Sequence, residues 1–140
     1  MSRVDLAKIA VCIVAAVMVV SVAESAFAKD LCLEDNFGGS YVFQKVKALK
    51  KPGKGPPLHG WYHLGKDILP IAGSAVVGSD GTVRAAVTIY EVDQGAVSIV
   101  MGWRGDATLA GTGDYDNNDS GSSSGSIVLT SVNCKTVTLP

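Results

Sequence analysis

The residues of this sequence that could do chemistry are few, and two cysteines are the most informative of them. Cys32 and Cys134 remain once an N-terminal leader containing Cys12 is removed. An even number of cysteines in an exported chain is typical of a disulfide. No Cys-x-x-Cys pair is present, which favours a structural bond over a redox role. We therefore expect a Cys32–Cys134 disulfide that joins the first residues of the domain to its last strand.

The other polar residues form no catalytic pattern. The chain has two histidines and no thiol left free after cysteine pairing, so no nucleophile has an evident base beside it. Its paired carboxylates lie in polar loops, where nothing would raise their pKa. We expect no enzymatic activity, no catalytic residues and no cofactor.

Spacing argues against two possible metal sites. His59 and His63 on an extended strand would lie roughly 13 Å apart, too far to bind one ion together. The loop that begins at Asp116 starts like a calcium-binding loop, but Ile127 stands at the twelfth position, where a glutamate is needed. We expect no metal site.

Charge limits the partners of the chain. The net charge of −1 stays unchanged when the leader is removed, because two basic and two acidic residues leave with it. This balance argues against a nucleic-acid or membrane-surface binder. Residues 45–54 contain five lysines with no arginine or aromatic residue among them. This composition favours a solvent-exposed loop over a loop that binds anions.

The elements that would position these residues are β-strands, and the clearest signal lies in residues 70–103. The middle part, residues 82–90, alternates apolar and polar side chains with a period of two. That period is typical of a strand with one buried and one solvated face. In the next strand we place Val97, Ile99, Met101 and Trp103 together on the buried face.

The turn before residue 82 predicts how two of these strands pair. A three-residue loop, Ser79-Asp80-Gly81, puts its glycine in the left-handed conformation of a β-bulge. This register buries more carbon than a two-residue loop at the same place, and register follows the hydrophobic pattern. The predicted pairs are Val77 with Val83, Ala75 with Ala85, and Ile71 with Ile89.

The whole chain reads as all-β. Eight strands in up-and-down order with short links predict a small closed antiparallel barrel, because closure removes exposed edges. A β-sandwich is the alternative. Residues 50–57 hold two glycines and three prolines and are expected to form a loop. The expected strands are 40–47, 59–63, three within 70–103, 108–115, 126–132 and 134–139.

The N-terminus has the pattern of a secretory signal peptide. Arg3 and Lys8 precede an apolar run of 14 residues, 9–22, and Ala26-Phe27-Ala28 is a small-x-small cleavage site. The run is too short to span a bilayer, so we expect no membrane anchor after cleavage. Residues 1–28 would leave, and residues 29–140 would form a single domain of 112 residues. The expected location is secreted or periplasmic.

Two short segments carry a family resemblance. Asn36-Phe37-Gly38-Gly39-Ser40-Tyr41 is similar to an Asn-Phe…Gly-x-Trp motif, with Tyr41 at the tryptophan position. Gly113-Asp114-Tyr115 is similar to a Thr-Asp-Tyr motif that lies between strands six and seven. Both motifs belong to the lipocalins and other calycins, which are small eight-stranded barrels. The resemblance implies that a small apolar ligand binds inside the barrel.

Two classes of function follow from this architecture. A ligand carrier would need a cavity, and we expect its ligand-binding residues to be Trp61, Met101, Trp103 and Tyr41, with both indoles lining one pocket near a barrel mouth. The alternative for the indoles is that they fill the core, as side chains do in small barrels. The alternative function is a protein-binding module or barrel-type inhibitor, which would need an exposed aromatic residue or a protruding loop. The partner is then a small hydrophobic ligand or an unidentified protein.

Overall fold

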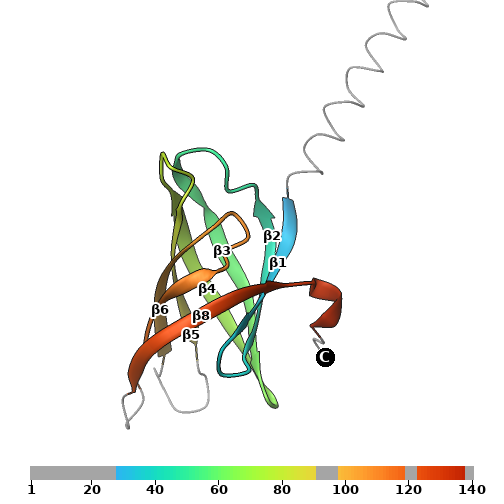
Figure 1. Ribbon diagram of the computed structural model, residues 1–140. Helices are drawn as coiled ribbons and strands as arrows, with labels where there is room; N and C mark the ends of the chain where they lie inside the picture. Colours follow the sequence, from blue (N-terminus) through green and yellow to red (C-terminus); the bar gives the residue numbers. More distant parts are fainter. Residues whose placement is uncertain (1–27, 91–97, 119–122, 138–140) are drawn as a thin grey trace, which may run out of the picture.

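The described part of the chain folds into eight antiparallel strands (Figure 1). The computed structural model describes residues 28–90, 98–118 and 123–137. Of the predicted signal peptide, residues 1–28, all but Ala28 lies outside the described residues. The elements are β1 (Ala28–Asp35), β2 (Ser40–Lys47), β3 (Gly53–Leu64), β4 (Asp67–Val77), β5 (Val83–Tyr90), β6 (Ser98–Gly105), β7 (Gly111–Asn117), β8 (Ser124–Val132) and a short 3₁₀ helix, η1 (Cys134–Thr136).

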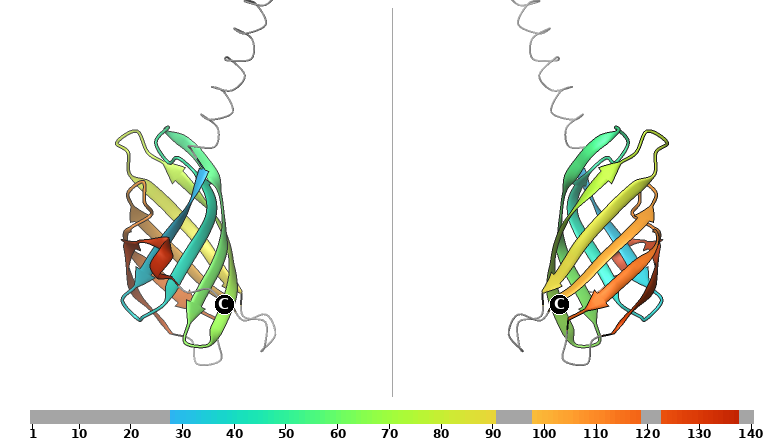
Figure 2. Two further views of the ribbon diagram at one scale, coloured as in Figure 1. Left: turned by 90° about the vertical axis from the view of Figure 1, so that its right-hand side faces the viewer. Right: turned by 90° about the vertical axis from the view of Figure 1, so that its left-hand side faces the viewer.

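The strands close into a barrel. Each strand pairs with its neighbour in sequence, and β1 also pairs with β8, so that Cys32 lies opposite Val42 on one side and Val132 on the other. The two side views in Figure 2 show tilted strands wound around one axis. The predicted all-β up-and-down barrel is confirmed, and the sandwich alternative is excluded by the β1–β8 pairing.

The β4–β5 hairpin has the predicted register. Val77 pairs with Val83, Ala75 with Ala85 and Ile71 with Ile89. Gly81 adopts a φ of 84°, as the bulged three-residue loop requires. The Asp80 carboxylate accepts a hydrogen bond from Thr82 N at 3.0 Å, and that bond lowers the pKa of the carboxyl.

The structure corrects several of the predicted strands. Residues 28–35 form a strand that the sequence pattern did not reveal, and it takes the place of the expected strand at 134–139, whose first residues form η1. Residues 53–57 belong to β3, because a register shift between Lys54 and Pro57 accommodates the prolines. β7 begins at Gly111 instead of Thr108. The strand count was therefore right although two assignments at the chain ends were wrong.

Glycine lets β6 and β7 approach closely. A Cβ atom on Gly113 would lie 2.1 Å from Gly102 O and 2.5 Å from Trp103 Cα. No side chain fits there without moving the neighbouring backbone. Gly113 is thus a site of close contact between the two strands, which is a common reason for a glycine inside a strand.

One half of the barrel interior is filled by its own side chains. Trp103 is buried, its ring centroid lies 6.4 Å from that of Phe43, and its Nε1 donates a hydrogen bond to Leu109 O at 2.8 Å. Leu109 has a φ of 68° and is fully buried, so the β6–β7 turn folds back onto this end of the barrel. This end is closed by Trp103 and Leu109.

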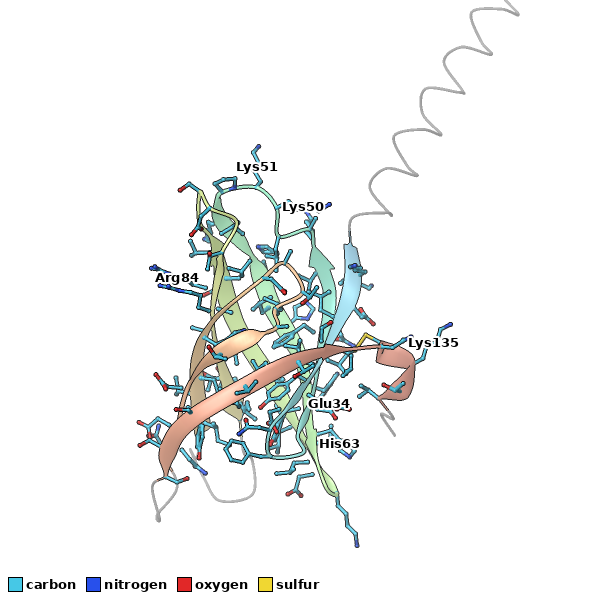
Figure 3. All side chains as sticks on the ribbon, in the orientation of Figure 1. Glu34, Lys50, Lys51, His63, Arg84 and Lys135 are labelled. Carbon is cyan, nitrogen blue, oxygen red and sulfur yellow. A yellow bond between two sulfur atoms is a disulfide. The ribbon has the colours of Figure 1, made fainter. Side chains whose placement is uncertain are left out.

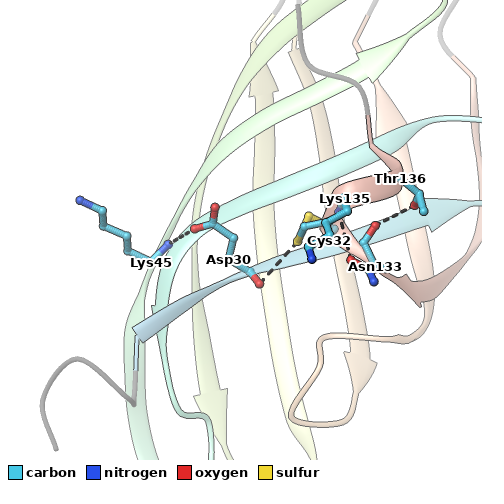
Figure 4. The surroundings of a disulfide bond; sticks show 7 residues. Asp30, Cys32, Lys45, Asn133, Lys135 and Thr136 are labelled. Atoms are coloured by element: carbon cyan, nitrogen blue, oxygen red, sulfur yellow. Dashed lines mark hydrogen bonds between the residues drawn. A yellow bond between two sulfur atoms is a disulfide. The ribbon is translucent and has the colours of Figure 1, made fainter. Parts of the chain in front are cut away.

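The predicted disulfide joins Cys32 in β1 to Cys134 in η1 (Figure 4). Their Cα atoms lie 5.2 Å apart, and 102 positions separate them in sequence. Asn133 caps η1 by accepting a hydrogen bond from Lys135 N at 3.0 Å, which turns the chain back toward β1. The bond therefore fastens the segment after β8 to the first strand, and it is consistent with an oxidising compartment.

Candidate ligand site at one end of the barrel

A pocket of about 170 Å³ lies at the end of the barrel that carries the β1–β2 and β3–β4 turns. It is termed here the Asp35 pocket. One of its ten lining residues is charged and nine are apolar or aromatic. The lining residues are Asp35, Phe37, Tyr41, Tyr62, Leu64, Ile89, Ile99, Met101, Tyr115 and Ile127.

The polar centre of the pocket is the half-buried carboxylate of Asp35, the last residue of β1. Its Oδ1 accepts hydrogen bonds from Phe37 N and Gly39 N, each at 2.8 Å. Its Oδ2 accepts a hydrogen bond from the Tyr41 hydroxyl at 2.7 Å. Bonds from two backbone groups and one side chain fix the carboxylate in place, because the β1–β2 turn wraps around it.

Tyr41 forms the buried partner of this carboxylate. Its side chain is 1% exposed, and its hydroxyl lies 3.6 Å from Met101 Sδ. Burial raises the pKa of the Tyr41 hydroxyl far above its ordinary value of 10.0, and the hydrogen bond to Asp35 raises it further. Tyr41 therefore stays protonated and remains a hydrogen-bond donor to Asp35 over the physiological range.

Aromatic rings form the walls and the rim of the pocket. The rings of Tyr41 and Tyr62 are tilted by 53° with centroids 4.9 Å apart. Phe37 meets Tyr115 edge to face at 5.6 Å, and Phe37 is 54% exposed at the opening. The rings stand at angles to one another, so they enclose a space and do not stack flat.

Gly39 makes room for this arrangement. A Cβ atom at this position would lie 2.6 Å from both Asp35 Oδ2 and Tyr62 Cε2. Both contacts are shorter than real Cβ atoms tolerate, so a side chain here would displace the carboxylate or the ring. The shape of the pocket thus depends on a glycine in the β1–β2 turn.

The structure brings two of the four predicted ligand residues into this pocket. Tyr41 and Met101 line it, whereas Trp103 closes the other half of the barrel. Trp61 is 40% exposed on the outer face of β3, because its neighbour Tyr62 points inward. The two indoles therefore do not share a pocket.

The sequence analysis missed the other lining residues for identifiable reasons. Asp35 closes a strand that was not predicted, and its role depends on the β1–β2 turn. Tyr62 was missed because the predictions for this strand concerned His59, Trp61 and His63, which lie on the opposite, outer face of β3. Leu58 and Tyr62 are four positions apart and therefore share a face of the strand, and their apolar character could have indicated that this face points inward.

The opposite end of the barrel is basic. A second hollow, of about 260 Å³, lies between the start of β1, the end of β2 and the β6–β7 turn, and three lysines line it: Lys29, Lys47 and Lys50. Figure 3 shows Lys50 and Lys51 at this end and Glu34 and His63 toward the end with the Asp35 pocket. The lysine-rich segment that the sequence singled out thus lies far from the aromatic pocket.

Within residues 28–90, 98–118 and 123–137, no three histidine, cysteine, aspartate or glutamate side chains gather closely enough to hold a metal ion. In the same ranges, no helix is long and apolar enough to cross a membrane. Val97, which we predicted to lie on the buried face of its strand, lies outside the described residues.

Fold and pocket define a class: a small, disulfide-bonded, closed eight-stranded barrel with an aromatic pocket at one end. Comparisons of the chain with protein-family models, with curated proteins and with solved structures found no match. Residues 36–39 form the β1–β2 turn, and Gly113-Asp114-Tyr115 lies inside β7 instead of between strands six and seven. The chain shares the barrel architecture of calycins, and membership of that superfamily stays a prediction.

Proposed function

We propose that the protein is an exported, non-enzymatic binding protein that takes a small, largely apolar molecule into the Asp35 pocket. The observation that carries the proposal is the pocket itself: nine apolar or aromatic side chains around one fixed polar group. Ligand sites are typically concave and apolar, with few well-placed polar groups. The calycin resemblance implies the same class of ligand.

The volume of the pocket limits the ligand. An apolar cavity of about 150 Å³ holds one benzene ring, whereas pockets for larger ligands run from about 300 Å³ upward. At about 170 Å³, the Asp35 pocket fits a single ring or a short branched chain. A longer molecule would extend past Phe37 at the opening.

The disulfide and the signal-peptide pattern support a site of action outside the cytoplasm. A Cys32–Cys134 bond persists in an oxidising compartment. We propose that the protein is secreted or periplasmic, where it would meet its ligand directly.

A pair of variants on β6 tests the proposal. Ile99 lines the pocket, whereas Val100, the next residue, points outward. We expect neutral 2-phenylethanol to shift the amide resonances of pocket residues in a saturable one-to-one titration. Ile99→Trp should fill the pocket and abolish these shifts, and Val100→Trp should leave them unchanged. Absence of saturable shifts, or equal binding by both variants, would overturn the proposal.

The alternative function, a protein-binding module, is favoured by one observation. Trp61 offers an exposed indole on the outer face of β3, away from the pocket. Tryptophan is enriched at the centres of protein interfaces. Binding of a purified partner that is lost in Trp61→Ala and unaffected by Ile99→Trp would support this alternative.

A further inference from the structure

The Asp35 carboxylate carries a negative charge that no cation of the described chain balances. Its hydrogen-bond donors are two backbone N–H groups and the neutral Tyr41 hydroxyl. In the described residues no lysine, arginine or histidine pairs with it. A half-buried charge without a counter-ion is costly unless a partner compensates it. A cation that enters the pocket would supply that compensation.

The carboxylate also has room for one more hydrogen bond. An ionised carboxylate has about four acceptor positions. Oδ1 takes two donors and Oδ2 takes one, so these three bonds leave one of the four acceptor positions, on Oδ2, unused. The Tyr41 hydroxyl already donates its proton to Oδ2, so it does not donate a hydrogen bond to a ligand. An anionic head group would therefore face a negative charge, whereas an ammonium group could donate to Oδ2.

The aromatic rings around the carboxylate favour a cation as well. Phe37, Tyr41, Tyr62 and Tyr115 surround the pocket at angles to one another. The face of an aromatic ring carries partial negative charge and attracts ammonium groups within about 6 Å. The Met101 sulfur adds a polarizable contact on the inner side. A carboxylate within several rings is a suitable environment for an alkylated or aryl-substituted amine.

The distribution of charge along the barrel axis also favours a cation at the Asp35 pocket. Lysines gather at the opposite end: Figure 3 shows Lys50 and Lys51 there, and Lys29, Lys47 and Lys54 lie at the ends of β1, β2 and β3 on the same side. At the pocket end the strand termini and turns carry four described carboxylates, Glu34, Asp35, Asp67 and Asp116, beside Lys66 and His63. A mouth with an excess of negative charge raises the local concentration of cations.

From these observations we infer that the Asp35 pocket binds a small organic cation, an amine with an apolar ring or chain, whose ammonium group contacts the Asp35 carboxylate. The inference rests on the proposed function and specifies its ligand class. Fatty acids and other apolar anions are then poor ligands for this site.

Three probes of similar size and different charge test the inference: 2-phenylethylamine, 2-phenylethanol and 3-phenylpropanoate. We expect calorimetry on the full exported chain at neutral pH to show the amine binding about tenfold or more tightly than the alcohol, as suits a hydrogen bond to a charged group. The propanoate should bind most weakly. Equal affinities, or tightest binding of the propanoate, would overturn the inference and leave the pocket as a neutral apolar site. No binding by any probe would overturn the proposed function too.

Two variants assign the preference to Asp35. Asp35→Asn keeps an acceptor for the turn and removes the charge, so the tenfold preference for the amine should disappear while the affinity for the alcohol changes less than about twofold. Glu34→Gln removes an exposed neighbouring charge and should keep the preference. If Asp35→Asn does not fold, Phe37→Leu at the exposed rim replaces it and should lower the preference for the amine without removing it, because one ring that faces the cation is lost while the carboxylate remains. A preference that survives in Asp35→Asn, or that is undiminished in Phe37→Leu, would contradict the inference.

Discussion

Replacing Tyr41 with phenylalanine removes one hydroxyl from the centre of the Asp35 pocket. The hydroxyl donates to a charged carboxylate at 2.7 Å from a side chain that is 1% exposed. A hydrogen bond to a charged group contributes about 1.5–3 kcal/mol to the free energy of unfolding. For a domain of this size we expect Tyr41→Phe to lower the Tm by roughly 6–12 °C.

Urea unfolding measures this effect directly. The midpoint should fall while the slope stays constant, because the surface exposed on unfolding does not change. Tyr90→Phe is the matched control: Tyr90 is 47% exposed at the end of β5, and its variant should stay within about 0.5 kcal/mol of wild type. A Tyr41→Phe protein as stable as the control would refute the assignment of the Tyr41–Asp35 bond as the polar centre of the pocket.

The same hydroxyl predicts how stability depends on alkaline pH. Its pKa is raised in the folded state, so its contribution is complete below the unfolded pKa of about 10 and is lost as the pH rises above that value. Wild type should therefore lose more unfolding free energy than Tyr41→Phe between pH 9 and 11 in urea titrations, a range of about two units around that pKa. Parallel losses in the two proteins would contradict the raised pKa.

The remaining predictions concern covalent bonding, packing and the filled half of the barrel. Replacing Cys32 and Cys134 with serine should cost about 2–5 kcal/mol of stability in urea unfolding, and thiol labelling of the unreduced, denatured protein should find no free thiol; two free thiols would refute the disulfide. Gly39→Ala should destabilise the fold and alter the resonances of the pocket, whereas Gly102→Ala, whose added Cβ would meet nothing closer than 3.9 Å, should not; similar melting curves would count against the tight contacts at Gly39. Trp103→Ala should cost about 3–5 kcal/mol of stability by leaving a cavity, and it should leave probe binding at the opposite end unchanged. Loss of binding without loss of stability would contradict the assignment of Trp103 to the filled half of the barrel.

The sequence allowed the β4–β5 hairpin to be predicted because a turn signal and a hydrophobic pattern lie next to each other there. Asp80-Gly81 located the turn, alternation over residues 82–90 showed which side chains share a face, and the greater burial of carbon favoured the three-residue loop. Together they specified the pairing of Val77 with Val83 residue by residue. The disulfide was predictable for a different reason, since cysteine number and export leave one pairing.

The strands at the chain ends could not be predicted from local pattern. β1 carries two charged residues at each end and no alternating apolar pattern, and it is stabilised by pairing with β2 and with β8, which is distant in sequence. Residues 134–136 have strand-like composition, but the disulfide and the Asn133 cap hold them in a 3₁₀ turn. These outcomes depend on tertiary contacts that no short window contains.

Two of the ten lining residues of the candidate site, Tyr41 and Met101, were predicted as ligand residues, and the other eight required the fold. Met101 was placed on the inner face by alternation, and Tyr41 was singled out with the calycin-like motif. Trp61 was misplaced, because alternation groups residues by face without saying which face is inside. Asp35 joins the site through the β1–β2 turn, which depends on a strand that was not predicted.

A crystal structure of the protein soaked with 2-phenylethylamine tests the central claim most directly, because it locates the ligand. The account predicts the phenyl ring between the aromatic walls of the Asp35 pocket and the ammonium nitrogen within hydrogen-bond distance of Asp35 Oδ2. A pocket that stays empty at saturating amine, or an amine bound elsewhere on the barrel, would contradict it.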